Sequence, residues 1–438
     1  MRTICLTITI AACVSACATT GTVPGRADVG EELRARTGKD LRDEPEGALP
    51  PGVTLAALTR EDAVAVALWN SPAFEASLTD LGLARADLVE ARLLRNPILS
   101  LLFPIGPKQL EWTLQLPVNV LWERPRRVAA AMSNARAVGE RLVYEGLTLV
   151  ADVRTGFAEA VAGERRVTLA AANAELTRRI AGIADARLRA GDISELEART
   201  ARSDAAQVDA ELRALQHARE LAALTLIARM GVDTPPAQVK LISGAVAAAA
   251  PCESPEALVE DAVSSRPDVR AAEIAVEAAG QRLSWERTRI ANFIALLDTN
   301  GPQGVAGVEM GPGFTSDIPV FSRNQGFRDR AAAELDRAGR MYLAVRAQVA
   351  AEVRSAAVRL AQAQQVREIW TKEIVPSLEV EQRQAESAYK AGEVALLTIL
   401  DVNRRLVQAR LRQLEVELDL DRAAIALDRS VGRACASV

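Results

Sequence analysis

Two groups of acidic residues, each following a glycine turn, are the feature of this chain most suggestive of chemistry. They are Asp192, Glu195 and Glu197 after Gly191, and Glu393 and Asp401 after Gly392. Carboxylates held close together raise one another's pKa and concentrate cations. Glu197 and Asp401 lie six and nine positions beyond their glycines, about two helical turns away. The pattern predicts either a cation-attracting constriction or ordinary solvated charges near the start of two helices.

Other reactive residues do not gather into a catalytic or metal-binding set. His217 is the single histidine and has no ligand partner four positions away. Cys252 and Cys435 are too isolated to form a zinc site. The glycine-rich stretch 304–313 lacks the strand-to-helix context of a phosphate loop. The sequence therefore predicts a protein that is not an enzyme and that carries no cofactor and no metal site.

The N-terminus reads as a targeting segment. Residues 1–16 contain one basic residue and then an apolar stretch too short to cross a bilayer, which is typical of a signal peptide. Val14-Ser15-Ala16-Cys17 resembles the lipobox of bacterial lipoproteins, which predicts a lipid on Cys17. Cys13 is a rival attachment site, and cleavage without lipidation is a further alternative. Ala18 favours the outer membrane, and residues 17–58 read as an extended tether rich in Gly, Pro and charge.

Composition predicts long helices. The chain has 438 residues, 49% of them hydrophobic and 25% charged, with 3% aromatic residues and a net charge of -4. Alanine dominates the apolar fraction, on a background of Arg, Glu and Gln, as in long helices. This composition excludes wholesale disorder, and the net charge provides no general attraction for nucleic acid.

Most of the chain consists of two copies of an internal sequence repeat, at an offset of about 200 residues. Six short matches recur in the same order, among them Asn70-Ser71-Pro72 with Ser265-Arg266-Pro267 and Met230-Gly231 with Val431-Gly432. The predicted domains are the first repeat at 59–231, a Pro- and Ala-rich linker at 232–253, the second repeat at 254–432 and a tail at 433–438.

Each repeat reads as helix, β-hairpin, very long helix, tight turn and long helix. In the first repeat we expect a helix over 59–95 with Thr59 as its N-cap, ended by Asn96-Pro97. Alternation over 110–116 and a weaker pattern over 98–105 predict two strands around Gly106-Pro107. Residues 125–190 then form a helix roughly 100 Å long, and 192–229 run back.

The second repeat follows the same plan. We expect a helix to about Ile290, strands over 293–299 and 304–310, and a long helix from Asn324 that Pro376 should kink. A further helix runs from the Gly392 turn to Arg429. Spacings of three and four predict a coiled-coil seam in the long helix, formed by Val345, Val349, Val353, Ala356, Leu360 and Ala363.

This arrangement resembles the TolC family of outer-membrane efflux proteins over residues 59–432. Asn96-Pro97 before the first hairpin and Ala391-Gly392 before 396–400 are characteristic of the family. The resemblance implies a mostly α fold in which a homotrimer forms a tube: a 12-stranded outer-membrane β-barrel with four strands per protomer, and a long α-helical barrel. The stretch 318–326 is similar to the cobalt–zinc–cadmium branch. The predicted hairpins are short for membrane-spanning strands, which need ~9–11 residues.

The resemblance also assigns roles to the two turns. It implies that Glu197 and Asp401 line the pore gate, and that a periplasmic adaptor docks at Ala190, Gly191, Asp192, Ala391, Gly392 and Glu393. A plain connection between antiparallel helices is the alternative for the turns.

Three functions are compatible with the chain. The first is the outer-membrane channel of a tripartite efflux pump, working with an adaptor and an inner-membrane pump and exporting small solutes such as heavy-metal cations. The second is the channel of a type I secretion system. The third is a lipid-anchored periplasmic coiled-coil scaffold without a pore. The alternating strand and the repeat favour a channel over the scaffold.

Overall fold

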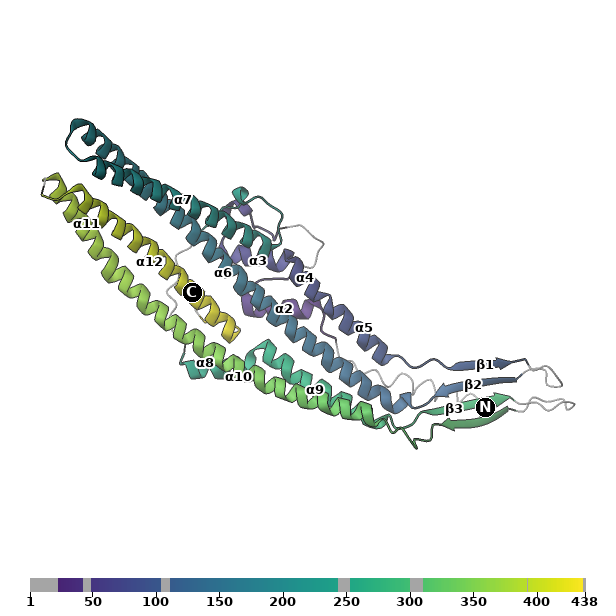
Figure 1. Cartoon of the computed structure of the whole chain (residues 1–438). Coiled ribbons are helices and arrows are strands. Elements are labelled where there is room, and N and C mark those ends of the chain that lie inside the picture. The colour runs from purple at the N-terminus through teal and green to yellow at the C-terminus, as the bar shows by residue number, and fades with distance from the viewer. Residues whose placement is uncertain are drawn as a thin grey trace. The chain divides into compact units, whose positions relative to one another are not determined.

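The computed structural model describes residues 23–41, 49–103, 111–242, 253–299, 310–391 and 393–435. The chain divides into two compact units, and each takes segments from both repeats (Figure 1). Unit 1 lies within Met1–Asp28, Thr79–Glu140 and Ala271–Tyr342, and unit 2 within Val29–Leu78, Arg141–Arg270 and Leu343–Val438. The predicted signal peptide, Cys17, the Gly106-Pro107 turn, Cys252 and Gly392 lie outside the described residues.

Unit 1 contains an antiparallel sheet in the order β1-β2-β3-β4. Its strands are β1 (Ile98–Leu102), β2 (Glu111–Pro117), β3 (Phe293–Thr299) and β4 (Met310–Ser316). Leu114 of β2 lies opposite Leu99 of β1 on one side and Leu297 of β3 on the other. The hairpins of the two repeats are thus joined through β2 and β3, while β1 and β4 remain edges.

The last strand runs beyond its predicted end. A strand was expected over 304–310, and β4 covers Met310–Ser316, whereas residues 300–309 lie outside the described part of the chain. Gly311 and Gly313 hide the period-two pattern of this strand, because glycine contributes no side chain to either face. The strand predicted over 293–299 is confirmed as β3.

Three helical segments lead into and out of the sheet in unit 1. α5 (Asp80–Arg92) precedes β1, and the C-terminal part of α9 (Pro267–Thr288) precedes β3. After β2 the chain enters α6 (Val120–Ala190), which begins five residues before the predicted start at Pro125. Pro125 is tolerated so close to the helix start because its missing N–H forgoes only one bond of the second turn. The side chain of Asn119 donates to Glu123 at 3.0 Å just ahead of it.

The first repeat contributes α3 (Arg60–Asn70), α4 (Pro72–Leu78) and the hairpin of α6 with α7 (Glu195–Met230) to unit 2. The single helix predicted over 59–95 is therefore broken into α3, α4 and α5. Pro72 forces Ser71 into an extended conformation, which ends α3. Thr59 caps α3 as predicted, accepting from the backbone N–H of Asp62 at 3.2 Å. Two 3₁₀ turns, η1 (Leu55–Ala57) and η2 (Pro236–Gln238), flank a parallel bridge between Leu58 and Leu241.

The second repeat supplies α8 (Pro255–Ser265), α10 (Gln325–Ile369), α11 (Val375–Lys390) and α12 (Leu396–Val431). The part of α10 in unit 2 confirms the predicted seam: Val349, Val353, Ala356 and Leu360 are buried. Near Pro376 the chain forms a π-helical turn, η3 (Trp370–Ile374), with Val375 N–H donating to Trp370 O. The proline removes one backbone hydrogen bond, and the wider turn beside it accommodates that loss; the kink at Pro376 stays a prediction.

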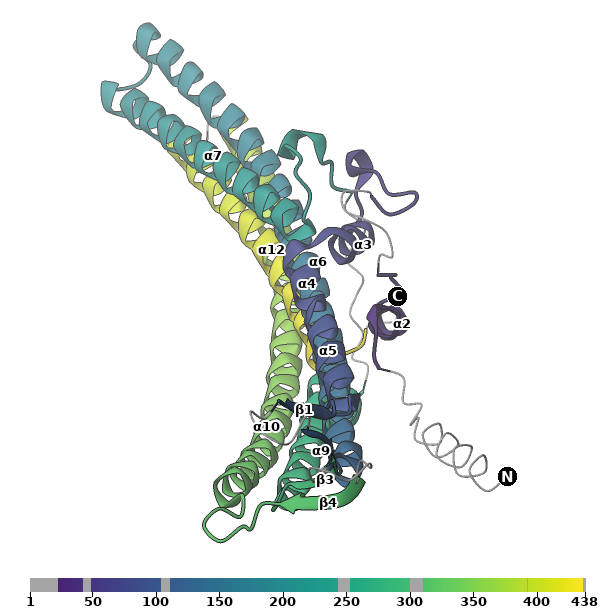
Figure 2. The same ribbon diagram turned by 90° about the vertical axis from the view of Figure 1, so that its right-hand side faces the viewer.

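Close packing in unit 2 uses the matched glycines of the repeats. Gly231 ends α7 and Gly432 ends α12, both with positive φ. A Cβ on Gly231 would lie 2.1 Å from the carbonyl oxygen of Asn70, so only glycine lets this helix end approach the α3–α4 break. α6 and α12 lie side by side in both views (Figures 1 and 2), and Ala158 and Ala162 of α6 pack against Leu418 of α12.

The predicted extended tether contains a packed helix. α2 (Arg26–Thr37) lies largely in unit 2, and its Val29 and Leu33 are buried there. Leu33 approaches α6 where Gly146 leaves space, and Arg36 donates to Ser265 O at 2.9 Å and Gly432 O at 3.2 Å. The i,i+4 spacing of Val29 and Leu33 gives this polar segment one apolar contact line. No helix among the described residues is long and apolar enough to span a membrane.

Candidate functional site

The first helical turn is built as a tight closed loop. α6 ends at Ala190, and Gly191 follows with φ +79°. Asp192 N–H donates to Arg187 O at 2.9 Å, and Gly191 N–H donates to Leu188 O at 3.1 Å. These bonds satisfy carbonyls that the helix end would otherwise leave unpaired. Ala190, Gly191 and Asp192 are all exposed, so the tip offers its surface to solvent.

The second turn repeats this construction 201 residues later. Glu393 N–H donates to Ala388 O at 2.9 Å, the counterpart of the bond from Asp192 to Arg187. Ala391 and Glu393 are exposed, whereas Gly392 lies outside the described residues. Two loops of the same design, both in unit 2, therefore present short exposed tips. Both tips lie at the same end of unit 2 in Figure 1.

Glu197 is engaged in capping its own helix. Ser194 is the N-cap of α7, and its N–H and hydroxyl donate to the Glu197 carboxylate at 2.8 and 3.0 Å. The backbone bond from Ser194, with the hydroxyl bond, holds the pKa of Glu197 below its ordinary value. Glu197 is thus anionic at neutral pH, and it lies in the first turn of α7, closer to the tip than predicted.

Asp401 lies in the second turn of α12 and belongs to an ion-paired group. Its carboxylate receives a hydrogen bond from Arg405 at 3.1 Å, and Arg405 also donates to Glu381 of α11 at 2.7 Å. The three side chains together carry one net negative charge. Asp401 remains largely exposed, with a side-chain exposure of 57%. The structure therefore places both predicted gate carboxylates near the turns, but neither is a bare charge.

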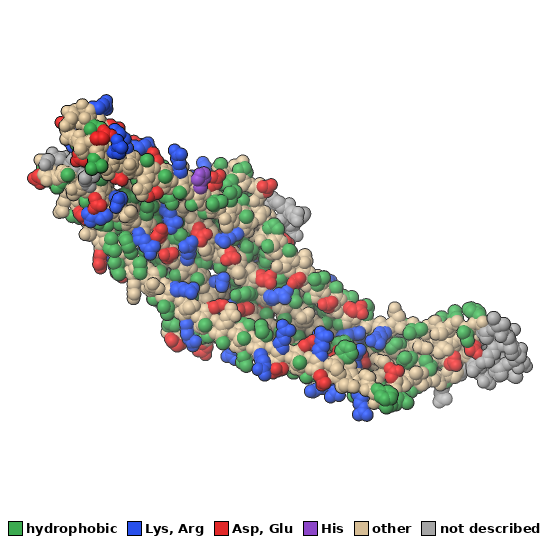
Figure 3. Space-filling model, viewed as in Figure 1, with side chains coloured by type: hydrophobic (Ala, Val, Ile, Leu, Met, Phe, Trp, Pro, Cys, Tyr) green, Lys and Arg blue, Asp and Glu red, His purple; other side chains and the backbone are tan. Residues whose placement is uncertain are grey.

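A cavity of about 280 Å³ lies beside these turns, between the α6–α7 hairpin and α12 in unit 2. Asn173 and Asp204 line it from the hairpin, and Asn403 and Arg404 line it from α12. The two hairpins are therefore in contact behind their tips. Charged side chains of both signs are interspersed over the visible face of the hairpins (Figure 3).

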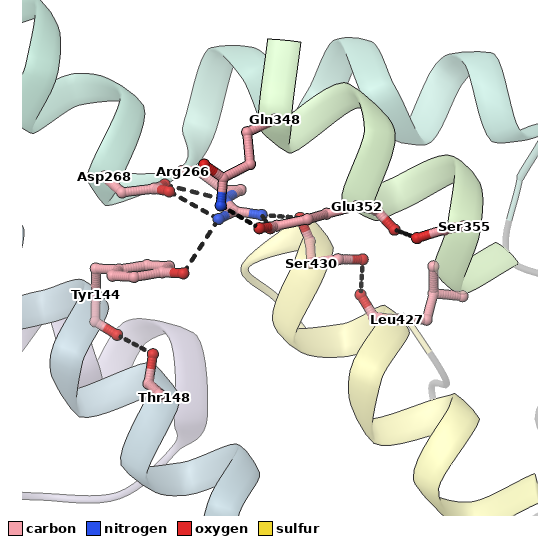
Figure 4. A network of polar contacts seen from close by, with 9 residues as sticks. All are labelled: Tyr144, Thr148, Arg266, Asp268, Gln348, Glu352, Ser355, Leu427 and Ser430. Atoms are coloured by element: carbon pink, nitrogen blue, oxygen red, sulfur yellow. Dashed lines mark hydrogen bonds and ion pairs between the residues drawn. The ribbon is translucent and has the colours of Figure 1, made fainter. Parts of the chain in front are cut away.

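An arginine that the sequence reasoning did not single out joins four elements of unit 2 (Figure 4). Arg266, at the α8–α9 break, is 2% exposed. It donates to Asp268 at 2.9 and 2.7 Å, to Glu352 of α10 at 2.9 Å and to Ser430 O of α12 at 2.7 Å. Its guanidinium also lies 5.3 Å from the ring centre of Tyr144 on α6. The only sequence signal was the repeat itself, since Arg266 occupies the place of Ser71.

Arg266 and its two carboxylate partners stabilise one another's charged forms inside the packing. Burial would lower the pKa of Arg266, but the hydrogen bonds and charge of Asp268, with those of Glu352, outweigh it and raise the pKa. Burial would raise the pKa of Glu352, but bonds from Gln348 and Arg266 lower it. The ion pairs are therefore fixed at neutral pH and hold the helices together.

The sheet of unit 1 has two chemically different faces. Opposed residues of antiparallel strands lie on the same face. Both charged residues of the strands, Glu111 and Asp298, fall on one face together with Ser100, Thr113 and Gln115. Thr113 donates to Asp298 across the strands at 2.8 Å. The other face, polar only at Thr299 and Ser316 among the described side chains, carries Leu99, Leu101, Trp112, Leu114, Leu116, Ala295, Leu297, Pro312 and Phe314.

Comparisons with known proteins point to one family. Residues 258–433 match the family described as Outer membrane efflux protein. The cobalt-zinc-cadmium resistance protein CzcC of Cupriavidus metallidurans is 26% identical over 384 residues, which cover 86% of this chain and 90% of that protein. Residues 258–433 therefore form a domain of the kind described as Outer membrane efflux protein. The predicted TolC-family resemblance is thereby confirmed.

Further similarities support the family and the fold. The pyoverdine export outer membrane protein OpmQ of Pseudomonas putida is 26% identical over 65% of this chain and 62% of its own length. A solved structure of CusC, a protein whose conformational changes accompany folding and transmembrane channel formation, superposes with a TM-score of 0.73 at 16% identity. It covers 90% of this chain and 99% of CusC. These findings confirm the TolC-like fold, with long helices and a small four-stranded sheet.

The family is one of channels rather than of enzymes. Within the described ranges, no group of three or more His, Cys, Asp or Glu side chains is arranged to hold a metal ion.

Proposed function

We propose that three copies of this efflux protein assemble into one closed barrel and form the exit channel of a tripartite pump. The observation that carries this proposal is the sheet of unit 1. It has two unpaired edges, β1 and β4, and an apolar face opposite a face that holds its charged residues. Exposed edges invite pairing with another chain, and closure into a barrel removes them.

The two faces then acquire distinct surroundings. In a membrane barrel the outer face contacts lipid and the inner face lines the water-filled lumen. Leu99, Leu114 and Leu297 would face lipid, and Thr113 and Asp298 would line the lumen. Three copies would contribute twelve strands, which matches the number predicted from the sequence.

The helical tips are the proposed contacts with partners. Ala190, Gly191, Asp192, Ala391, Gly392 and Glu393 would meet a periplasmic adaptor, which in turn joins an inner-membrane pump. The matched turns of the two repeats support this role, because a threefold assembly would present six equivalent tips. We further propose that Glu197 and Asp401 form the acidic gate behind these tips. A lipid on Cys17 would anchor the channel to the outer membrane.

The proposed substrates are small solutes that include heavy-metal cations. Support comes from the similarity to a cobalt-zinc-cadmium resistance protein and from the carboxylates near the turns. A pyoverdine export protein is also similar, so a preference for cations does not follow from the family. The preference is a property of the proposed gate and has to be measured.

The test combines mass and conductance. Full-length protein extracted in detergent should have the mass of a trimer in native mass spectrometry and should form cation-preferring pores in planar bilayers. A stable monomer that conducts no ions would refute the channel and favour a periplasmic scaffold.

A further inference from the structure

Two groups of large apolar side chains are exposed where the chain passes between helix and sheet in unit 1. Phe321, Ile318 and Val320 follow β4 and are 94%, 83% and 62% exposed. Leu93 and Leu94 precede β1 and are 53% and 56% exposed. Hydrophobic side chains gather on the visible surface where β4 leads into α10 (Figure 3). Such clusters of exposed apolar groups mark interaction surfaces.

The segment after β4 holds its shape by its own hydrogen bonds. Val320 N–H donates to Ile318 O at 2.8 Å, and Gln325 Nε2 donates to Phe321 O at 3.2 Å. Asn324, with φ +61°, donates to the backbone and side chain of Glu286, both at 2.8 Å. The loop is thus fixed on both sides of Phe321, and the aromatic ring is presented to solvent by a built scaffold.

The segment before β1 is fixed as well. Arg127 donates to Ala91 O at 3.0 Å and to Leu93 O at 2.7 Å, and Arg124 donates to Arg92 O at 2.8 Å. These arginines satisfy the last carbonyls of α5 and set the direction in which the chain leaves the helix. Leu93 and Leu94 therefore also occupy a defined position.

We infer that these two groups form a hydrophobic clasp between neighbouring copies, with Phe321 of one copy packed against Leu93 and Leu94 of the next. The inference rests on the proposed barrel. When β4 of one copy pairs antiparallel with β1 of the next, the end of β4 at Ser316 meets the start of β1 at Ile98. Phe321 lies five residues past that strand end, and Leu93 and Leu94 lie four to five residues before the strand start.

The topology brings the two groups together without any rearrangement. Adjacent strands lie about 4.8 Å apart, so segments that leave neighbouring strands at the same end remain close. Both groups lie at the free edges of the sheet, where a single chain leaves its apolar side chains uncovered. A second copy is thus the occupant that covers these groups. In the trimer, each copy contributes Phe321 to one neighbour and Leu93 and Leu94 to the other.

Cysteine cross-linking in the full-length protein tests this contact. In a Cys252→Ser, Cys435→Ser background, Leu94→Cys combined with Phe321→Cys should give a covalent trimer ladder with a short bismaleimide. The matched control is Leu94→Cys with Leu121→Cys. Leu121 is 70% exposed but follows β2, so it lies near Leu94 of its own copy and should give no ladder.

A second variant measures the contribution of the ring. Phe321→Ser should weaken association about 30-fold per interface, because the interface loses the burial of one large apolar side chain. Leu121→Ser should leave the trimer unchanged. A trimer that forms without cross-linking at the test pair would overturn the clasp. Lipid would then be the group that covers the Phe321 side chain, and the proposed function would stand. Absence of any trimer in native mass spectrometry would instead refute the proposed barrel.

Discussion

Replacing Arg266 by methionine should loosen the joint between α8, α10 and α12 in unit 2. Methionine keeps an unbranched side chain of similar length but removes the charge and every hydrogen bond. Removing one partner of a buried ion pair costs about 3–5 kcal/mol. The side chains of Asp268 and Glu352 are 20% and 26% exposed, so water can solvate their carboxylates after the substitution. The lower end of this energy range therefore applies. The expected loss is about 3 kcal/mol of local stability, including the bond to Ser430 O.

Hydrogen exchange followed by mass spectrometry measures this loss directly. Peptides that cover 262–270 and 425–432 should lose protection roughly 100-fold, because 1.4 kcal/mol corresponds to a factor of ten. The control is Arg340→Met, also on α10, where the arginine pairs with Asp336 at 2.9 Å and is 79% exposed. Exposed pairs contribute about 0.5 kcal/mol or less, so both peptides should keep their protection. Equal protection in Arg266→Met and the parent protein would refute the view that this arginine holds the helices together.

Three further predictions concern the gate, the sheet and pH. Replacing Glu197 and Asp401 together by alanine should weaken cation preference in planar bilayers, and unchanged selectivity would return both to the role of helix-flanking charges. Leu99→Lys, on the apolar face, should destabilise the membrane-inserted trimer by about 2–4 kcal/mol in denaturant titrations. Ser100→Lys on the polar face is the matched control, and equal losses would contradict the assignment of faces. Because the pKa of Glu352 is lowered on folding, its contribution is present above the ordinary pKa of about 4.3 and is lost as pH falls through the lower folded value. Exchange protection should therefore drop in acid, and Glu352→Gln should flatten that part of the profile.

Local patterns in the sequence predicted the long helices, the Thr59 cap and the seam of α10. Thr59 caps α3 as predicted, because capping depends on neighbours within a few residues, and Gly231 and Gly432 are the C-caps of α7 and α12. The capping box of Ser194 with Glu197 was readable in the same way, as was the i,i+4 pair of Asp401 with Arg405. Both local partners change the electrostatics of the proposed gate.

Contacts between distant segments could not be read from local patterns. The joining role of Arg266 had no local signal, because only Asp268 is near in sequence and its partners Glu352 and Ser430 are 86 and 164 residues away. The packing of α2 depends on Leu33 meeting Gly146 of α6. In β4 the alternation was invisible because Gly311 and Gly313 present no side chain. Each of these features depends on a partner whose position only the folded chain reveals.

The pairing of β2 with β3 also constrains the order in which this protein can mature. Trp112 lies opposite Thr299, so the centre of the sheet joins residues 187 positions apart, whereas the α6–α7 hairpin closes between near neighbours. Contacts of short separation form first because they lose less chain entropy, and distant pairing waits until the second repeat has emerged. A nascent chain that ends before residue 293 would carry β2 with an open edge toward other chains. The sheet therefore cannot be completed until the chain has been made at least as far as Ser316, and until then its open strand edges are available to other chains.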